Sequence, residues 1–469
     1  MSSAEPPPPS QCRTVAIAGV SGFVGRALAD ALASRFHVVG IGRSKKTASR
    51  SIAEWRSCDL FSLKDAEAAL AGVDVAVYLV HSMMPSAALT QGSFEDFDVL
   101  AADNFARAAA RSGVRQIVYL GGLIPEVGSA GLSRHLSSRL EVERVLGAHG
   151  TPVLALRAGL VVGRGGSSFE MLKRLVERLP MMLTPSWTAT RTQPIDLSDV
   201  VALLAYCISL GGARSGTYDV GGPDVLTYRE MIAKLAEQLG KSPRLVSIPF
   251  FTPGLSRLWV SLVTGAPKTL VAPLIQSLAH EMVAKDRSLQ AEAGIPGIPF
   301  EESLRRALAP VAAAVEAPVA YGGAGRLSPA KDVRSVQRLA LPAGRDADWV
   351  AHEYMRWLPT TIPMLFRVTV SDDLVCSFTL MGITLLQLAY AKDRSSPDRA
   401  LFYIRGGVLA DTRSERGRFE FREVPGSPWV LSAIHDFVPR LPWPVYALSQ
   451  AKVHLVVMAA FGRHLKRQA

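Results

Sequence analysis

The chain has 469 residues, of which 48% are hydrophobic and 20% charged, and it carries a formal net charge of +11. This composition excludes a wholly disordered chain, and the length indicates two to four compact units at about 150 residues each. The positive charge favours anionic partners, but the sequence has no helix-turn-helix, RNP motif or zinc-finger spacing, so we expect no nucleic acid partner.

The first twelve residues predict a disordered leader, because they are polar, contain Pro6–Pro9 and lack the apolar core of a signal peptide. No run reaches the about 20 apolar residues that cross a bilayer. The four cysteines form no CxxC pair, which favours a reducing cytoplasm over a disulfide framework. Cys58 and Cys207 are predicted core residues, and no His, Cys, Asp or Glu cluster has the spacing of metal ligands, so no metal is expected.

Residues 13–165 alternate short apolar β-rich runs with amphipathic helices. Such alternation predicts an α/β fold, a doubly wound parallel Rossmann sheet with helices on both faces. The predicted strands are 14–18, 38–41, 73–80, 116–120 and 153–156, and the predicted helices are 25–34, 66–70, 97–111 and 138–148.

The rest of the chain divides into three segments. Residues 166–309, with helices separated by glycine and proline, predict a smaller substrate lobe of the same unit, and residues 310–332, rich in Ala, Pro and Gly, predict a linker. Residues 333–469 predict a separate α+β domain with a final helix near 445–465. The apolar stretches 249–278 and 443–461 are expected to form buried core or pocket lining, with peripheral membrane contact as the alternative. The strand candidates are 333–341, 365–370, 374–379, 383–390, 400–408 and 417–424.

The most informative motif runs from Gly19 to Gly25, directly after the first strand and at the start of the first helix. In that position the first glycine permits a tight turn, the second lets the backbone approach a pyrophosphate, and the third lets the helix pack on the sheet. N–H groups at the helix start then hold the phosphates. The predicted cofactor contacts here are Gly19, Ser21, Gly22, Phe23, Val24 and Gly25.

The end of the second strand indicates which dinucleotide is bound. An NAD site places Asp or Glu there, whereas this chain has Arg43 and Ser44 followed by two lysines. A basic residue accommodates the 2′-phosphate of NADP, and a guanidinium is well shaped for it. We therefore expect NADP(H), with NAD(H) and an exposed charge run on a loop as alternatives.

The glycine spacing and its surroundings resemble the short-chain dehydrogenase/reductase superfamily. They are closer to its atypical, NmrA-like members, which include NAD(P)H-binding proteins and an accessory subunit of respiratory complex I. The resemblance covers residues 13 to about 309 and includes Asn104, Pro194–Val200 and Gly221–Pro223. It implies further cofactor contacts from Asp59, Leu60, Val80, His81, Leu120, Gly121, Arg139, Ala158 and Gly159.

The chain departs from this family at the catalytic positions. Active members have a serine and a Tyr-x-x-x-Lys pair, but here Gly121-Gly122 stands at the serine and the helix carries His135 and Arg139. Histidine can exchange a proton near neutral pH, and arginine can hold a ribose but not lose a proton as readily as lysine. We expect His135 to be the proton donor, with His81 as the second candidate. Either redox catalysis persists with altered chemistry or it is lost.

The C-terminal segment resembles the START/SRPBCC-like helix-grip superfamily, on its series of strands, the run Phe402–Gly407 and the closing amphipathic helix. The resemblance implies a curved sheet around the last helix and an apolar cavity for a hydrophobic ligand. A packing or oligomerisation domain is the alternative.

Three functional hypotheses follow. The first is a cytoplasmic NADP-dependent oxidoreductase acting on an apolar carbonyl or alcohol, a hydrophobic small molecule bordered by Ser133 and Met181–Trp187. The second is a binding protein that senses NAD(P)H without turnover. The third is a respiratory or quinone-pathway accessory protein peripheral to the inner membrane face. No pattern in the sequence predicts the oligomeric state.

Overall fold

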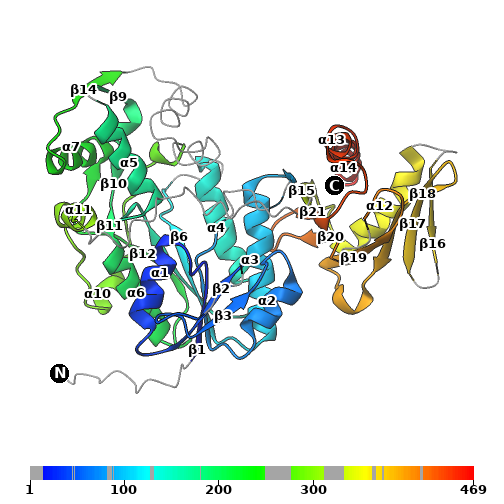
Figure 1. Cartoon of the computed structure of the whole chain (residues 1–469), viewed down its shortest axis with the longest axis horizontal. Helices are drawn as coiled ribbons and strands as arrows, with labels where there is room; N and C mark the ends of the chain where they lie inside the picture. Colours follow the sequence, from blue (N-terminus) through cyan, green and yellow to red (C-terminus); the bar gives the residue numbers. More distant parts are fainter. Residues whose placement is uncertain are drawn as a thin grey trace. The chain divides into compact units, whose positions relative to one another are not determined.

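The computed structural model describes residues 14–44, 46, 48–81, 87, 89–126, 131–179, 181–248, 276–310, 332–361, 366–371, 374–411 and 416–469. The chain divides into an N-terminal unit, residues 1–83 and 100–323, and a C-terminal unit, residues 84–99 and 324–469. Figure 1 shows both. The predicted leader, residue 82, residues 249–275 and the linker residues 311–331 lie outside the described residues.

The N-terminal unit is built on a seven-stranded sheet in the order β12-β7-β6-β4-β1-β2-β3. Every strand pair in it is parallel, so all carboxyl ends lie along one edge. The chain order reverses at β1, and ligands of such sheets bind beside this reversal. The strands are β1 (Thr14–Ala18), β2 (His37–Gly42), β3 (Glu54–Ser57), β4 (Val75–Tyr78), β6 (Gln116–Gly122), β7 (Val153–Ala158) and β12 (Gly216–Val220).

Helices cover both faces of this sheet, because successive residues of each strand point to opposite sides. Val15 and Ile17 pack in one core with α1 (Phe23–Leu32) and α6 (Leu197–Ser209). On the other face the ring of Tyr78 lies 5.0 Å from that of Phe105 on α3. The remaining helices are α2 (Leu63–Leu70), α3 (Phe94–Arg111) and α4 (Arg134–Leu146). The predicted doubly wound α/β fold is confirmed.

The rest of the N-terminal unit packs around a second core formed by α5, α7 and α11. The predicted boundary at residue 165 does not divide the sheet, since β12, which follows it, pairs with β7. The elements of this part are β8 (Val161–Val162), α5 (Ser167–Arg178), β9 (Met181–Pro185), β10 (Arg191–Thr192), β11 (Ile195–Asp196), β13 (Leu226–Thr227), α7 (Tyr228–Gln238), β14 (Arg244–Ile248), α10 (Ser288–Glu292) and α11 (Phe300–Leu308).

The C-terminal unit is an eight-stranded sheet in the order β16-β17-β18-β19-β20-β21-β15-β5, with helices that share its core. Its pairs are antiparallel except for the parallel pair of β5 with β15. Its elements are β5 (Leu89–Gln91), β15 (Val333–Ala340), α12 (Ala347–Thr361), β16 (Phe366–Val370), β17 (Val375–Leu380), β18 (Ile383–Tyr390), β19 (Arg399–Gly406), β20 (Arg418–Glu423), β21 (Trp429–Phe437), α13 (Trp443–Leu448) and α14 (Gln450–Lys466).

The separate α+β domain is confirmed, with corrections. Residues 84–99, which the prediction placed in the Rossmann domain, belong to the C-terminal unit, because β5 adds to its sheet. Helix α12 and strand β21 were not predicted, and the expected final helix is two helices that meet at Ser449. The START/SRPBCC-like resemblance stays a prediction.

Candidate functional site

The turn after β1 has no room for side chains at two of its glycines. Gly19 has a φ of +87°, a conformation that favours glycine, and a Cβ atom there would lie 2.9 Å from the carbonyl oxygen of Leu79. A Cβ atom on Gly25 would lie only 2.3 Å from the carbonyl oxygen of Gly19. The glycines therefore allow the start of α1 to pack directly on the turn, at the point where the sheet order reverses.

The first turn of α1 is arranged to receive an anion. Gly22 caps this helix without a side-chain hydrogen bond, and no acidic residue lies in the first turn. Ser21 and Gly22 are exposed, so the N–H groups and the positive end of the helix dipole can face a phosphate. Phe23 and Val24 are half-buried, and their side chains pack against residues 163–166 and the α1 core. These two residues therefore contribute backbone atoms, rather than side chains, to the site.

The end of β2 carries two exposed cations on a tryptophan support. Trp55 Nε1 donates to the carbonyl oxygen of Ser44 at 2.7 Å, and the indole ring occupies the space that a side chain on Gly42 would need. Lys46 Nζ lies 5.1 Å from the Trp55 ring centroid, and Arg43 is exposed beside it. Trp55 was not among the predicted site residues, because its contacts with Gly42 and Ser44 join separate segments of the chain.

Asp59 and Leu60 lie next to this strand end, as the resemblance implies. The Cys58 N–H donates to the last carbonyl of β2 at 3.0 Å, and Asp59 Oδ1 accepts from a backbone N–H two residues on. The side-chain amide of Asn104 donates to the carbonyl oxygen of Leu60 at 2.8 Å. Asn104 is fully buried, so it positions this segment from beneath the sheet edge.

The three predicted catalytic residues meet at the carboxyl ends of β4 and β6. The rings of His81 and His135 lie 5.3 Å apart, and Arg139 Nη2 is hydrogen bonded to His81 Nδ1. Because a guanidinium only donates, His81 Nδ1 accepts and its ring proton lies on Nε2. The hydroxyl of Tyr119 donates to the carbonyl oxygen of Arg139 at 3.3 Å, which ties α4 to β6. His81 and Arg139 thus come together from segments 58 residues apart.

The other predicted contacts also lie along this edge. Val80, Leu120, Gly121 and Gly159 are half-buried and Ala158 is buried, each at or just beyond the end of its strand. A Cβ atom on Gly122 would lie 3.8 Å from Arg139 Cγ, an ordinary contact. Of the two glycines at the family's serine position, Gly122 therefore has space for a side chain beside Arg139, whereas a Cβ atom on Gly121 would lie 2.9 Å from the Tyr119 ring.

The residues predicted to line the substrate site differ in their burial and contacts. Ser133 is buried, caps α4 and shares a 2.8 Å hydrogen bond with Ser277. Trp187 packs against Tyr228, with ring centroids 6.1 Å apart, in the core of α5, α7 and α11. Met181 is exposed, and the side chains of 182–186 lie outside the described residues.

Neither thiols nor metal ligands contribute to this site in the described part of the chain. Cys58 and Cys207 are buried, as predicted, and burial raises the pKa of Cys207 to about 12 and that of Cys58 even further. Such thiols do not supply a thiolate at neutral pH. Across the described residues, no three His, Cys, Asp or Glu side chains gather as a metal would require.

Comparisons with known proteins agree with this geometry. Residues 19–150 match a family model described as NAD(P)H-binding. The auxiliary protein GraX of Staphylococcus aureus is 33% identical over 142 residues, which cover 30% of this chain and 42% of that protein. The mitochondrial NADH dehydrogenase (ubiquinone) 1 alpha subcomplex subunit 9 of Arabidopsis thaliana is 25% identical over 160 residues, which cover 34% of this chain and 39% of that protein. The matches thus span less than half of each curated relative.

Solved structures share the fold at low identity. A nucleoside-diphosphate-sugar epimerase from Staphylococcus aureus is 16% identical with a TM-score of 0.50, and the match covers 62% of this chain and 99% of that one. The triphenylmethane reductase of Citrobacter sp., complexed with NADP(H), is 19% identical with a TM-score of 0.50, covering 63% and 100%. Residues 19–150 are thus similar to NAD(P)H-binding proteins, and the N-terminal unit shares its fold with these solved structures.

Proposed function

We propose that the N-terminal unit is an NADP(H)-dependent oxidoreductase that interconverts an apolar carbonyl compound and its alcohol. The observation that carries the proposal is the meeting of His81, His135 and Arg139 beside the glycine turn. When bound, NADPH supplies the hydride that the carbonyl carbon accepts. His135 donates the proton that the carbonyl oxygen takes up, so the products are the alcohol and NADP⁺.

Arg139 has two roles in this proposal. Its guanidinium holds His81 through Nδ1, and its charge would replace that of the family's lysine in holding the nicotinamide ribose. His81 then directs its Nε2 proton away from Arg139 and is the second candidate for proton transfer. The apolar class of the substrate rests on the composition of 181–187 and 249–278.

Replacing Arg43 by alanine is expected to weaken NADPH binding by about 10- to 100-fold while NADH binding changes little. The lost interaction is a charge-assisted contact to the 2′-phosphate, about 1.5–3 kcal/mol, which NADH does not make. Fluorescence titration of the wild type and the variant with both cofactors measures it. The control is Arg305→Ala, which removes an equal charge from the exposed face of α11. Equal losses for NADPH and NADH would overturn the NADP assignment.

Replacing His135 by alanine is expected to lower kcat by about 10²- to 10⁴-fold, the usual contribution of a positioned proton donor. The dissociation constant for NADPH should stay within about threefold, because the phosphates bind at α1. NADPH oxidation with a panel of apolar ketones, aldehydes and quinones gives the rate. The control is His37→Ala, an exposed histidine at the start of β2. Turnover that survives in His135→Ala but not in His81→Ala would move the proton donor to His81.

A sensor without turnover is the second candidate function. The replacement of the family's serine by glycine, and of its tyrosine and lysine by His135 and Arg139, favours it. Tight NADPH binding by the wild type, with no oxidation of NADPH by any member of the panel, would support the sensor and exclude the oxidoreductase.

A membrane-peripheral location is favoured by the C-terminal helices. In the described part of the chain, Trp443–Lys466 is the one helical segment long and apolar enough to cross a membrane, and 28% of its apolar stretch is buried. Leu448, Val453 and Val456 are 70%, 59% and 66% exposed. Residues 443–469 contain four lysines and arginines and no Asp or Glu. Exposed apolar residues on a segment whose own charged side chains are all cationic suit a helix that lies on an anionic lipid surface.

The protein is accordingly expected to sediment with vesicles of phosphatidylglycerol and phosphatidylcholine in equal parts, and much less with phosphatidylcholine alone. Leu448→Ser together with Val456→Ser should lower the bound fraction at least tenfold, since each removes about 1.5–3 kcal/mol of apolar burial. The control pair is Val370→Ser and Met381→Ser, equally exposed at 59% and 73% but on β16 and the turn after β17. Unchanged sedimentation of the α13–α14 variant would refute the membrane contact.

A further inference from the structure

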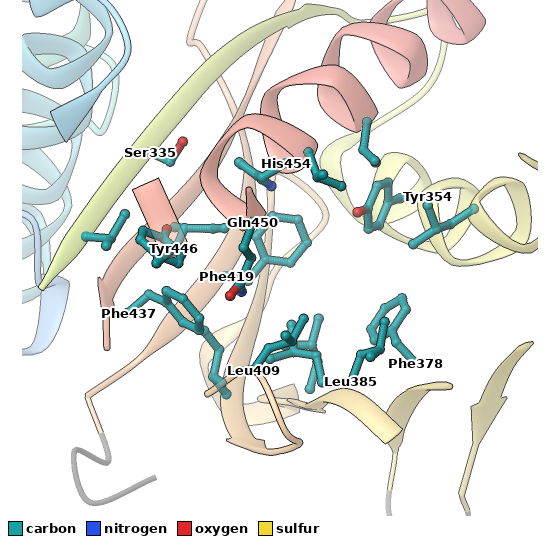
Figure 2. Close-up of a pocket in the computed structure, with 18 of the residues that line it drawn as sticks. Ser335, Tyr354, Phe378, Leu385, Leu409, Phe419, Phe437, Tyr446, Gln450 and His454 are labelled. Atoms are coloured by element: carbon teal, nitrogen blue, oxygen red, sulfur yellow. The ribbon is translucent and has the colours of Figure 1, made fainter. Parts of the chain in front are cut away.

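The C-terminal unit contains a cavity of about 300 Å³ between its sheet and its helices. Figure 2 shows the lining: apolar side chains such as Phe378, Leu385 and Leu409 on one side, and Gln450 and His454 of α14 on the other. The volume lies at the lower end of the range of small-molecule sites, about 300–1,000 Å³. The cavity belongs wholly to the C-terminal unit, so it is separate from the glycine turn of the N-terminal unit.

A chain of hydrogen bonds connects several polar groups on the α14 side of the cavity. His454 Nε2 donates to Gln337 Oε1 at 3.2 Å, and Gln337 Nε2 donates to Ser335 Oγ at 2.8 Å. Ser335 Oγ donates in turn to Gln91 Oε1 at 3.1 Å, and Gln91 Nε2 donates to the carbonyl oxygen of Ala451. Gln91 of β5 thus accepts from Ser335 of β15 and donates to Ala451 of α14, and so links the inserted strand to both elements.

Gln450 stands outside that chain. Within the residues that the structure describes, its Oε1 is a buried acceptor without a hydrogen-bond partner. An unpaired buried acceptor costs about 1–3 kcal/mol, and proteins keep few of them. A group that lines a cavity and lacks a donor is therefore well placed to receive one from a bound molecule.

The lining also restricts the charge of such a molecule. Among the lining residues that the structure describes, none is Lys, Arg, Asp or Glu. Burial lowers the pKa of His454 to about 4, so this side chain is neutral at pH 7. Burial also raises the pKa of Tyr446 to about 12. A charged ligand would lose its hydration without gaining a counter-charge, which is costly.

We infer that this cavity is a binding site for a neutral, largely apolar molecule whose single hydroxyl or N–H group donates a hydrogen bond to Gln450 Oε1. Aliphatic or aromatic alcohols have this chemistry. The apolar body fills the space lined by Phe378, Leu385 and Leu409, and the donor satisfies the amide oxygen of α14. The inference goes beyond the proposed function and does not depend on it, because the lining residues that the structure describes all belong to the C-terminal unit.

Calorimetric titration of the full chain with three probes tests the inference. The probes are 1-decanol, its isomer 1-methoxynonane, which has no donor, and decanoate, which is charged. We expect 1-decanol to bind about 2- to 10-fold tighter than its isomer, the range given by about 0.5–1.5 kcal/mol for one hydrogen bond. Decanoate should bind at least tenfold more weakly than 1-decanol.

Gln450→Met removes the acceptor and keeps the length of the side chain, so it should bind the two isomers equally, with the affinity for the ether unchanged. Gln468→Met, at an exposed glutamine beyond the end of α14, is the control and should keep the preference for the alcohol. Equal binding of both isomers by the wild type, no binding of either, a preference for decanoate, or a preference for the alcohol that persists in Gln450→Met would each overturn the inference. If Gln450→Met does not fold, the wild-type comparison of isomers still decides it. All titrations are made without NADPH, so the outcome is independent of the oxidoreductase activity.

Discussion

Gly25→Ala is expected to weaken NADPH and NADH binding at least 100-fold. A Cβ atom at this position would lie 2.3 Å from the Gly19 carbonyl oxygen and 2.8 Å from Val20 Cα. Both are backbone atoms, so no side-chain rotation relieves the overlap and α1 must move away from the turn. The N–H groups at the helix start then no longer converge on the pyrophosphate. A 100-fold loss corresponds to about 2.7 kcal/mol.

The matched control for this prediction is Gly147→Ala. Gly147 caps the end of α4 with a φ of −85°, and a Cβ atom there would lie 3.7 Å from its nearest neighbour, an ordinary contact. The same fluorescence titration should give a wild-type dissociation constant for the control. Thermal unfolding of both variants separates a local change of the turn from global destabilisation. A Gly25→Ala protein that binds NADPH within threefold of the wild type would contradict the assigned role of the turn.

The N-terminal fold could be predicted because its determinants are local. The run from Val15 to Ala18 is uniformly apolar, as a strand buried on both faces must be, and the glycine turn follows it directly. Asp196 caps α6, and Thr227 and Glu230 form a capping box at the start of α7, so helix starts also show in the sequence. Each of these features acts within a few residues of its own position.

Other elements depend on distant partners and could not be predicted in this way. Strand β5 is three residues long, and its backbone pairs with β15, far along the chain. Three residues are too few for an alternating pattern to appear. Helix α12, by contrast, was predictable: Val350, Tyr354 and Leu358 recur at helical spacing and are all buried.

In the candidate site too, some features could be predicted from the sequence, and others depend on contacts between distant segments. The resemblance to a known family placed His81, His135 and Arg139 at one sheet edge, and the structure brings them together. No sequence pattern indicates that Trp55 supports the Arg43 loop or that Gln450 has a buried, unpaired oxygen, because both depend on contacts between separate segments. Physical contacts of this kind appear only once the chain is folded.

The second large effect concerns a buried charge cluster in the C-terminal sheet. Glu420 Oε2 accepts from Arg399 Nε at 2.8 Å and Arg422 Nη2 at 3.0 Å, and Oε1 accepts from His435 Nε2 at 3.1 Å. None of the four residues is more than 4% exposed. Burial would raise the pKa of Glu420, but the charges of Arg422 and Arg399 and the His435 hydrogen bond outweigh it and hold the pKa well below its usual range. The carboxylate is therefore charged in the folded protein.

Glu420→Gln is expected to lower the free energy of unfolding of the C-terminal unit by about 3–5 kcal/mol, because it removes the buried carboxylate that faces two guanidinium groups. Hydrogen exchange of peptides from β19, β20 and β21 measures this loss locally, while peptides from β1 and β6 of the N-terminal unit should keep their protection. Asp393→Asn, at an exposed carboxylate of the same unit, should change the unfolding free energy by no more than about 0.5 kcal/mol. A Glu420→Gln protein that differs from the wild type by less than about 1 kcal/mol would mean that the two arginines, rather than the carboxylate, set the stability of this sheet. The distinction matters for the cavity, since β19, β20 and β21 each contribute a lining residue, and a loosened sheet would lose the apolar ligand together with its own protection.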